Sequence, residues 1–335
     1  MTAAASVPRM PSGRRRILGR DTRTAYLYLV PAFLVMAAIT FYPLLFQTWM
    51  SFTDFQIGNL RNPATAPWVG LSNYQKILES RLGIPNFDFI RMIAFNLFWA
   101  LSNVILHVVI GVGIAVLLNS PGLKFKKFYR ALFILPVIIP PLIVATVWRN
   151  MFDTSNGAVN LGLQAVGGLF KIPAEAFNID WLRQVQEPIA FLPLPLAYFA
   201  LLAANTWLGW PLNSVVATGA LQSIPHELYE AAEMDGASSW QKFRTVTIPF
   251  LRPAMVPYAI YGFVITFNLF YLSYFMSGGG PNGQTELLVT QAYKLVDEQR
   301  LYGVAAAFSI FIFFILLVIT IFANRAAKAT ASFDA

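Results

Sequence analysis

Six long stretches of the chain lack charged residues, and each is rich in apolar side chains. A helix needs about 20 mostly apolar residues to cross a hydrocarbon core of about 30 Å. The pattern therefore predicts an all-α integral membrane protein with about six transmembrane helices. The uncharged stretches are residues 24–53, 92–123, 131–148, 188–226, 253–285 and 301–324.

Within these stretches the residue types set the expected helix bounds. Pro136, Pro140 and Pro141 interrupt the third span, where we expect a hinge, because proline bends are tolerated where helices pack around a cavity. Residues 158–170 are apolar but too short to cross, which favours a helix lying on the surface. The sixth span is almost entirely aliphatic and Phe, so we expect it to face lipid, Phe311 and Phe313 included. The predicted spans are 25–51, 89–118, 128–149, a segment within 189–221, 253–276 and 301–324.

The basic residues predict the orientation. Of the 24 Lys and Arg residues, 15 lie in the two terminal segments and in the loops on the same side of the membrane, and cytoplasmic segments carry such an excess. Both termini are therefore expected in the cytoplasm. The expected organisation is a cytoplasmic basic arm at 1–24, a membrane domain at 25–324, outer loops at 52–88, 150–188 and 277–300, a cytoplasmic loop at 222–252 and a cytoplasmic tail at 325–335.

Composition excludes several classes of protein. With 57% apolar and 12% charged residues, the chain has too little polar surface for a water-soluble enzyme. The net charge of +8 lies at membrane edges rather than on a nucleic-acid-binding face. The chain has no Cys, so disulfides and thiolate metal sites are excluded. The apolar run after Arg23 is too long for a cleaved signal peptide and should remain as an anchor.

A helical hairpin is predicted in the 222–252 loop. Pro225 fits the first turn of a helix, and Gly236 can adopt the left-handed conformation that ends one. Ser238 and Gln241 have the spacing of a capping box, in which each side chain accepts a hydrogen bond from an unpaired N–H at the start of a second helix. An ordinary polar connection between two spans would show the same capping signals.

A longer pattern surrounds this hairpin. Glu-Ala-Ala at 230–232, Asp-Gly-Ala at 235–237 and Val-Thr-Ile-Pro at 246–249 closely resemble the coupling loop in the membrane subunits of bacterial ABC importers. Asn-Thr-Trp-Leu-Gly-Trp-Pro at 205–211 and Gly-Gly-Gly-Pro at 278–281 resemble its flanks in the sugar-permease branch, which includes the maltose and glycerol-3-phosphate systems. The resemblance extends roughly from Phe128 to Phe322.

The resemblance implies a type I ABC importer permease fold and a non-catalytic subunit of the bacterial inner membrane. The implied partners are a second homologous permease, two copies of an ABC ATPase, an extracytoplasmic sugar-binding protein or lipoprotein, membrane lipid and a sugar. It implies no cofactor in this chain, because the ATPase binds ATP and Mg²⁺, and no nucleic acid. The implied ATPase-coupling residues are Glu227, Glu230, Ala231, Ala232, Asp235, Gly236 and Ala237.

A sugar pathway is expected where fourth- and fifth-span residues meet. Leu212, Gly262, Thr266 and Leu269 replace more polar or aromatic types found at the sugar-contacting positions of maltose-type members, so the sequence fixes neither the sugar nor whether this subunit holds it. Whether the second permease differs from this chain also stays open. The candidate pathway residues are Asn205, Trp207, Gly209, Leu212, Tyr258, Tyr261, Gly262, Thr266, Asn268 and Leu269.

The second span carries Asn96, Asn103 and His107 along one side. Polar side chains inside bundles more often bond neighbouring helices than a ligand, so packing is the favoured interpretation. His107 is not expected to bind a metal, because the chain has only two His residues and a zinc site takes three or four ligands.

The sequence fits two other classes of protein less well than an importer. An ion- or proton-coupled carrier normally keeps carboxylates within its spans, and the predicted spans have none. A membrane enzyme would need a catalytic constellation, and no His/Asp/Ser or metal pattern is visible in the spans. The chain also lacks a Gly-x-x-x-x-Gly-Lys-Ser/Thr loop, so ATP has to be bound elsewhere.

Overall fold

The computed structural model describes residues 17–120, 122–188 and 193–330. Most of the predicted arm therefore lies outside the described residues, as do residues 331–335 of the tail. Residues 17–24, predicted as arm, already belong to the first helix. Within the described ranges the chain is helical, with a single isolated β-bridge between Thr53 and Trp68.

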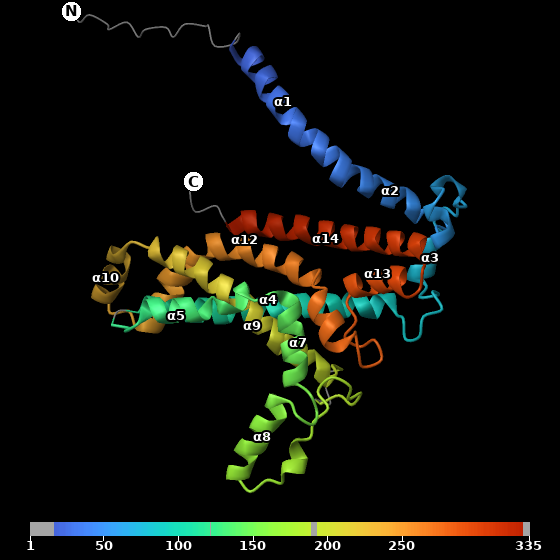
Figure 1. Ribbon diagram of the computed structural model, residues 1–335. Helices are drawn as coiled ribbons and strands as arrows, with labels where there is room; N and C mark the ends of the chain where they lie inside the picture. Colours follow the sequence, from blue (N-terminus) through green and yellow to red (C-terminus); the bar gives the residue numbers. More distant parts are fainter. Residues whose placement is uncertain (1–16, 121, 189–192, 331–335) are drawn as a thin grey trace, which may run out of the picture.

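Figure 1 gives the order of the helices along the chain. Longer helices form the bundle, and short helices and loops join them. The labelled helices are α1 (Ile17–Met36), α2 (Tyr42–Ser51), α3 (Ser72–Leu78), α4 (Phe89–Asn119), α5 (Lys126–Phe133), α6 (Leu135–Ile138), α7 (Pro141–Met151), α8 (Ala158–Leu169), α9 (Leu196–Gln222), α10 (His226–Met234), α11 (Ser239–Lys242), α12 (Ile248–Phe267), α13 (Leu288–Asp297) and α14 (Tyr302–Thr330). Tighter or wider turns occupy Ala37–Phe41, Ile57–Leu60, Pro63–Thr65, Ala174–Phe177, Phe243–Thr247 and Ser273–Ser277.

Four helical stretches are long and apolar enough to cross a membrane. A fifth span is formed if Lys126–Ile138 and Pro141–Met151, which are bent by 95° at their junction, count together. The predicted 189–221 span is the helix α9, which is not among the four because polar residues such as Asn205, Asn213 and Ser214 lower its mean hydropathy. The four are Arg23–Ser51, Phe89–Asn119, Ser239–Phe267 and Tyr302–Ala327.

Two predicted spans are interrupted in the structure: the third, where the prolines predicted a bend, and the fifth, which we expected to be continuous. The third breaks between Ile138 and Pro141, because a residue before proline is driven towards extended backbone and both Ile139 and Pro140 are extended. The fifth ends at Phe267 rather than near 276. After a short irregular stretch at 268–270, a new helical segment ends in the π-helical turn Ser273–Ser277.

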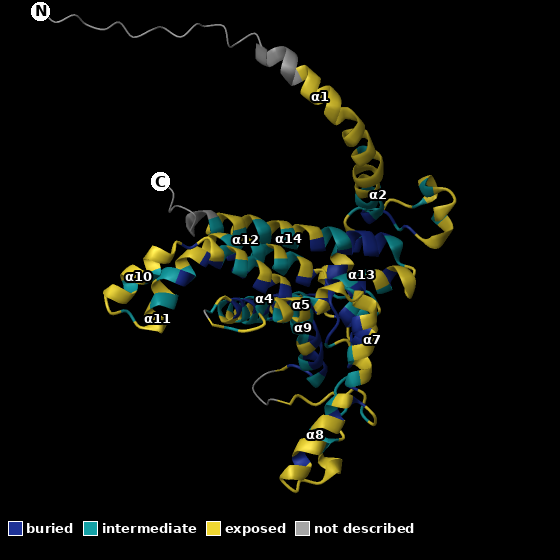
Figure 2. Cartoon of the chain, turned by 60° about the vertical axis from the view of Figure 1, so that its left-hand side comes forward, coloured by how far each residue is buried: buried dark blue, intermediate teal, exposed yellow. Residues whose placement is uncertain are grey.

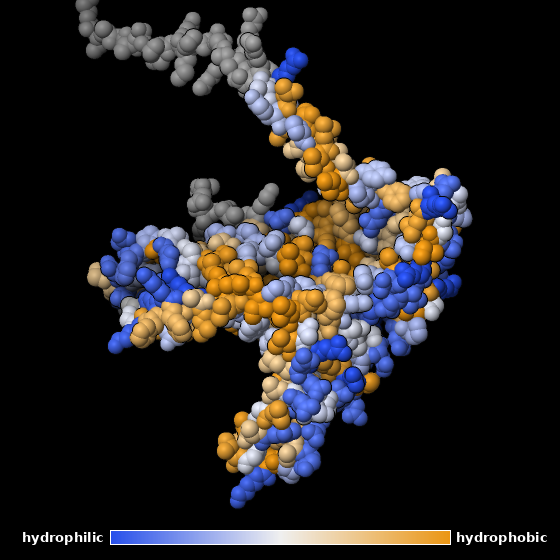
Figure 3. All heavy atoms as spheres, viewed as in Figure 1, coloured by the Kyte–Doolittle hydropathy of each residue, from blue (hydrophilic) through white to orange (hydrophobic). Residues whose placement is uncertain are grey.

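The bundle is built on α4 and α9, which pack along one another, with α12 against both and α14 against α12, α13 and α2. In Figure 1, α10 lies at one end of the bundle and α3 and α13 at the other, here called the α10 end and the α13 end. Figure 3 shows hydrophilic side chains at both ends and an apolar band between them. This surface suits a membrane-spanning bundle.

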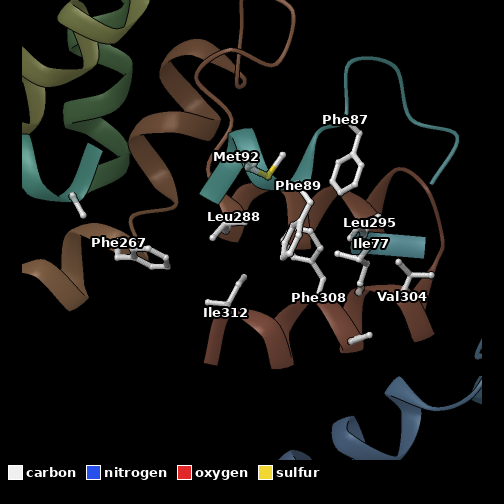
Figure 4. Close-up of a cluster of buried hydrophobic side chains, with 13 residues drawn as sticks. Ile77, Phe87, Phe89, Met92, Phe267, Leu288, Leu295, Val304, Phe308 and Ile312 are labelled. Atoms are coloured by element: carbon white, nitrogen blue, oxygen red, sulfur yellow. The ribbon is translucent and has the colours of Figure 1, made fainter. Parts of the chain in front are cut away.

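Buried apolar side chains form three clusters along the bundle. The first joins α3, α4, α13 and α14 at the α13 end, where Phe308 packs against Phe89 (Figure 4). The second surrounds Trp99 and Tyr198 between α4 and α9, and the third joins Leu221 to Leu251 near the α10 end. The prediction that α14 faces lipid along its length is therefore wrong for its first half. Phe311 packs on Tyr74 and Phe89, whereas Phe313 is exposed.

Two parts project from the bundle. The helix formed by α1 and α2 leans away from it, and its apolar side chains are exposed from Tyr26 to Leu45 (Figure 2). The helix α8, predicted as a surface helix, forms a separate lobe beyond α7 (Figure 1). Asn160 holds this lobe together, because its Nδ2 donates to the carbonyls of Thr154 and Ile179 and its Oδ1 accepts from the Trp181 indole.

Candidate functional site

A cavity of about 250 Å³, here called the central cavity, lies where α9 and α12 meet the break between α6 and α7. Three tyrosines line it, Tyr258, Tyr261 and Tyr271, and the rings of the first two lie 6.1 Å apart. None of the described residues lining it is Asp, Glu, Lys or Arg. A wall of aromatic rings, hydroxyls and amides without charge suits a neutral, hydroxyl-rich ligand.

Eight of the ten candidate pathway residues line this cavity. The two exceptions point elsewhere: Trp207 packs edge-on against Trp148 at 6.1 Å, and the Asn268 side chain donates back to the Val264 carbonyl at the end of α12. The eight lining residues are Asn205, Gly209, Leu212, Tyr258, Tyr261, Gly262, Thr266 and Leu269.

His107 also lines the cavity, although its favoured interpretation was packing. Its Nε2 lies 2.9 Å from the Asn205 carbonyl oxygen, and Asn205 Nδ2 donates to Asn103 Oδ1 at 2.7 Å. These bonds tie α4 to α9, which supports the packing interpretation. Asn96 acts likewise: its Nδ2 donates to the Phe267 carbonyl at 3.0 Å and its Oδ1 accepts from the Leu288 amide at 2.8 Å.

The two candidate glycines have different surroundings. A Cβ at Gly209 would fall on the His107 ring, so this glycine is required for α4 to approach α9. A Cβ at Gly262 would meet only Val104 Cγ2, at 4.0 Å. Gly262 therefore keeps open space in the cavity wall rather than permitting close packing.

Sequence reasoning missed several lining residues. Pro136, Val137 and Ile139 enter the wall because the bend after Ile138 turns α6 towards α9. The proline run had indicated a hinge, and it was the one available signal. No sequence signal indicated Asn213, because its place on the cavity depends on how α9 is rotated against α12.

The hairpin at the α10 end has the predicted local structure. Gly236 has φ +77°, and Ala237 N donates to the Ala232 carbonyl at 2.9 Å, which closes the C-terminus of α10. The Ser238 amide donates to Gln241 Oε1 at 2.7 Å, and the Gln241 amide donates to Ser238 Oγ at 3.3 Å, as a capping box requires. The candidate coupling residues therefore lie on one short, closed hairpin.

Five of the seven candidate coupling residues are solvent-exposed, and the other two, Ala232 and Ala237, are half-buried. The five exposed residues, on α10 or just after it, are Glu227, Glu230, Ala231, Asp235 and Gly236. Met234 is 90% exposed and Trp240 66%, so the hairpin also presents large apolar side chains. An exposed surface that combines apolar and acidic residues is suited to a protein partner.

One ion pair and two other polar contacts, which the sequence did not indicate, brace the hairpin. Lys242 Nζ pairs with Glu233, and this hydrogen bond and charge hold the pKa of the Glu233 carboxyl below its usual range. His226 Nδ1 lies 3.4 Å from Glu230 Oε1, one helical turn away. Tyr229 Oη lies 2.9 Å from Thr247 Oγ1, which joins α10 to the start of the long helix that follows.

The Gly-Gly-Gly-Pro segment at 278–281 forms a hydrogen-bonded loop at the α13 end. Lys294 Nζ donates to the Gly278 carbonyl at 2.8 Å and pairs with Glu286 Oε2 at 2.5 Å. A Cβ at Gly279 would strike the Glu286 carboxylate. Glu286 is only 5% exposed, so this part of the pattern has a packing role in the isolated chain.

The fold and the site define a multi-pass helical membrane protein with a central cavity and an exposed hairpin at one end. Residues 107–331 match the family described as "Binding-protein-dependent transport system inner membrane component". The chain belongs to that family.

Named relatives agree with this assignment. The chain is 31% identical over 312 residues, 91% of its length and 70% of the relative's, to a galactooligosaccharides transport system permease protein of Bacillus subtilis. It is 31% identical over 307 residues, 90% and 68% of the two chains, to a maltodextrin transport system permease protein of Streptococcus pneumoniae. A trehalose/maltose permease protein of Thermococcus litoralis is 29% identical, with 90% and 92% covered.

A solved structure supports the fold. A chain from a bacterial ABC transporter involved in the import of the acidic polysaccharide alginate superimposes with a TM-score of 0.75, covering 94% of this chain and 99% of that one at 22% identity. The predicted fold class, that of a type I ABC importer permease, is therefore confirmed.

Proposed function

We propose that this chain is a transmembrane subunit of an ATP-driven ABC importer and forms half of the pathway for a disaccharide or oligosaccharide. An extracytoplasmic binding protein delivers the sugar, and a separate ATPase is coupled through residues 225–249. The supporting observation is the uncharged cavity beneath Tyr258 and Tyr261, which matches a neutral sugar in polarity. The relatives named for galactooligosaccharide and maltodextrin transport support the same substrate class.

The proposed complex has two homologous permeases, which form a heterodimer if the second differs from this chain, and two ATPase copies that bind ATP and Mg²⁺. The α10 end faces the cytoplasm with both termini, and the 150–188 and 277–300 loops face outward. The exposed hairpin, with its acidic side chains and Met234, would lie in a groove of the ATPase.

A single helix supports the proposed coupling. Residues Ser239–Phe267 form one continuous helix of 29 residues, which is about 43 Å long at about 1.5 Å per residue. Its start belongs to the hairpin, and Tyr258, Tyr261, Gly262 and Thr266 on it line the cavity. A displacement of the hairpin by the ATPase would therefore move one wall of the cavity directly, as alternating access requires.

Reconstitution tests the proposal. The chain, purified with its co-encoded permease and ATPase in proteoliposomes, should accumulate maltodextrin or galactooligosaccharide only with ATP and a binding protein. Uptake driven by an ion gradient without ATP would instead identify a secondary carrier. Single cysteines at Ser238 and Ser155, both exposed, should label from the cytoplasmic and outer sides respectively. Labelling of both from one side would contradict the orientation.

A further inference from the structure

A second, larger cavity of about 470 Å³, here called the arginine cavity, lies outside the proposed sugar pathway. It is bounded by the end of α7, the turn around residues 180–183 and the segment from Tyr274 to Gly278. Two arginines and two aspartates line it, Arg149, Arg183, Asp153 and Asp180. No charged residue among those described lines the central cavity, so the two cavities have different chemistry.

The two carboxylates are already engaged by backbone N–H groups. Asp153 Oδ1 accepts from the amides of Ser155 and Asn156 at 3.0 and 2.9 Å, and Asp180 Oδ1 accepts from the Arg183 amide at 3.1 Å. The amide hydrogen bonds, with a smaller contribution from the Arg183 charge, lower the pKa of the Asp153 carboxyl. Both aspartates therefore act as caps of local turns.

The two guanidinium groups are not engaged in this way. Throughout the described ranges, neither Arg149 nor Arg183 has a carboxylate within 4.0 Å or a side-chain hydrogen bond. A guanidinium presents a planar fork of N–H donors that matches a carboxylate in bidentate geometry. Two such forks on one concave surface favour a carboxylate ligand.

The carboxylate that the two arginines would bind is not part of the transported cargo. A carboxylate carried into the central cavity would lose its water without meeting a cation among the described lining residues, and such desolvation is costly. This subunit therefore offers no cation in that cavity to a charged cargo. We assign the arginine pair to a group that stays outside the pathway.

The position of the arginine cavity connects it to the pathway. Arg149 lies on α7, which begins at Pro141 in the wall of the central cavity and packs against Ser273–Ser277. Tyr274 lines the arginine cavity, and Tyr271, three residues earlier, lines the central one. A ligand held by Arg149 would thus bear on two elements that enclose the sugar.

We propose that Arg149 and Arg183 receive an Asp or Glu side chain of the extracytoplasmic binding protein when it docks. The inference rests on the proposed function, which places this cavity on the outer side. Docking by one acidic side chain in a concave site makes the contact selective and sensitive to salt.

The test uses the full importer in nanodiscs with its co-encoded binding protein, measuring ATPase stimulation against binding-protein concentration. Both arginines are exposed in the free subunit, and docking would desolvate them. Arg149→Gln and Arg183→Gln should each raise the half-saturating concentration at least about thirtyfold, as expected for one partner of a desolvated charge pair. Basal ATPase and maximal stimulation should be unchanged, and the dependence on salt should be weaker than in the wild type. Arg149→Lys should recover only part of the loss, because it keeps the charge and loses the fork.

Arg81→Gln is the matched control, because Arg81 is an exposed arginine that already pairs with Glu79 at 3.1 Å. It should leave the half-saturating concentration unchanged. Equal curves for the wild type and both Gln variants would overturn the inference and leave the proposed function standing. If the Gln variants lose only the uptake of digalacturonate, an acidic disaccharide, and the binding protein still stimulates their ATPase as in the wild type, the arginines bind cargo. That result would also overturn the inference. A wild-type importer that no binding protein stimulates would refute the proposed function as well.

Discussion

Replacing Gly209 by Ala tests the contact on which the bundle depends. The added Cβ would fall on the His107 ring, which is buried between α4 and α9 with 6% of its surface exposed. Either the helices separate or the ring rotates and loses its 2.9 Å contact with the Asn205 carbonyl. Overpacking costs about 1–3 kcal/mol, and a buried polar group left unpaired costs about 1–3 kcal/mol. Since these are alternative responses, we expect a destabilisation of about 1–3 kcal/mol.

The assay is thermal unfolding of the purified subunit in detergent, with Gly219→Ala as the control. Gly219 lies on the same helix, and a Cβ there meets nothing within 4 Å. Its replacement should be neutral or stabilising, because Ala is favoured over Gly in a helix by about 1 kcal/mol. The double variant Gly209→Ala with His107→Ala should recover part of the lost stability. Equal unfolding temperatures for the Gly209 and Gly219 variants would refute the reasoning.

Three further predictions concern the pathway and the hairpin. Gly262→Leu should abolish uptake with little change in unfolding temperature, because the side chain would enter the cavity and only Val104 lies near; an unchanged uptake would remove Gly262 from the pathway. Gly236→Val should weaken co-purification with the ATPase, because a β-branched residue at φ +77° costs about 1–3 kcal/mol. Gly236→Asn should have a milder effect. An ATPase complex as stable with Val as with Gly would contradict the role of the turn. Tyr229→Phe and Thr247→Val should each lower the amount of sugar transported per ATP hydrolysed, because each breaks the 2.9 Å contact between the two hydroxyls. The double variant should lower it no further than either single variant. Additive effects would show that the pair does not act as one unit.

The helices were predictable from the sequence because their signals are local. The apolar stretch before Lys124 predicted 89–118, and α4 runs Phe89–Asn119. The capping residues of the hairpin were likewise correct, because a cap involves only neighbours within a few positions. Proline gave the place of the bend after Ile138, though not its 95° angle, which depends on packing.

Features that depend on distant residues could not be predicted. Phe311 resembles Phe313 in sequence, and only the approach of Tyr74 and Phe89 buries one of them. Trp207 lies within the family pattern but turns towards Trp148, because the rotation of α9 is set by its contacts with α4. The arginine cavity joins residues from three separate segments, so no stretch of sequence contains its signal.

The distribution of hydrogen bonds indicates which helices move during transport. Side-chain bonds join α4 to α9 over residues 102–107 of α4, from Tyr198 Oη donating to Ser102 Oγ at 2.7 Å to the His107 contact. Among the residues described here, the side-chain bond that joins α12 to either of these helices is that of Asn96 at the Phe267 end. The α4–α9 pair should therefore stay rigid while α12 pivots about Phe267.

Spin labels can test this pivot by the distances between them with and without ATP. Labels at Ile105 on α4 and Val215 on α9, both exposed, should keep their separation. Labels at Leu117 on α4 and Phe250 near the start of α12, also exposed, should change separation by several ångströms, on the scale of other helix shifts of about 1–5 Å. Because α12 is continuous with the hairpin, Gly236→Val should reduce that change. A Leu117–Phe250 distance that ATP leaves unaltered, or an Ile105–Val215 distance that changes as much, would show that α12 does not move as a lever against a fixed pair.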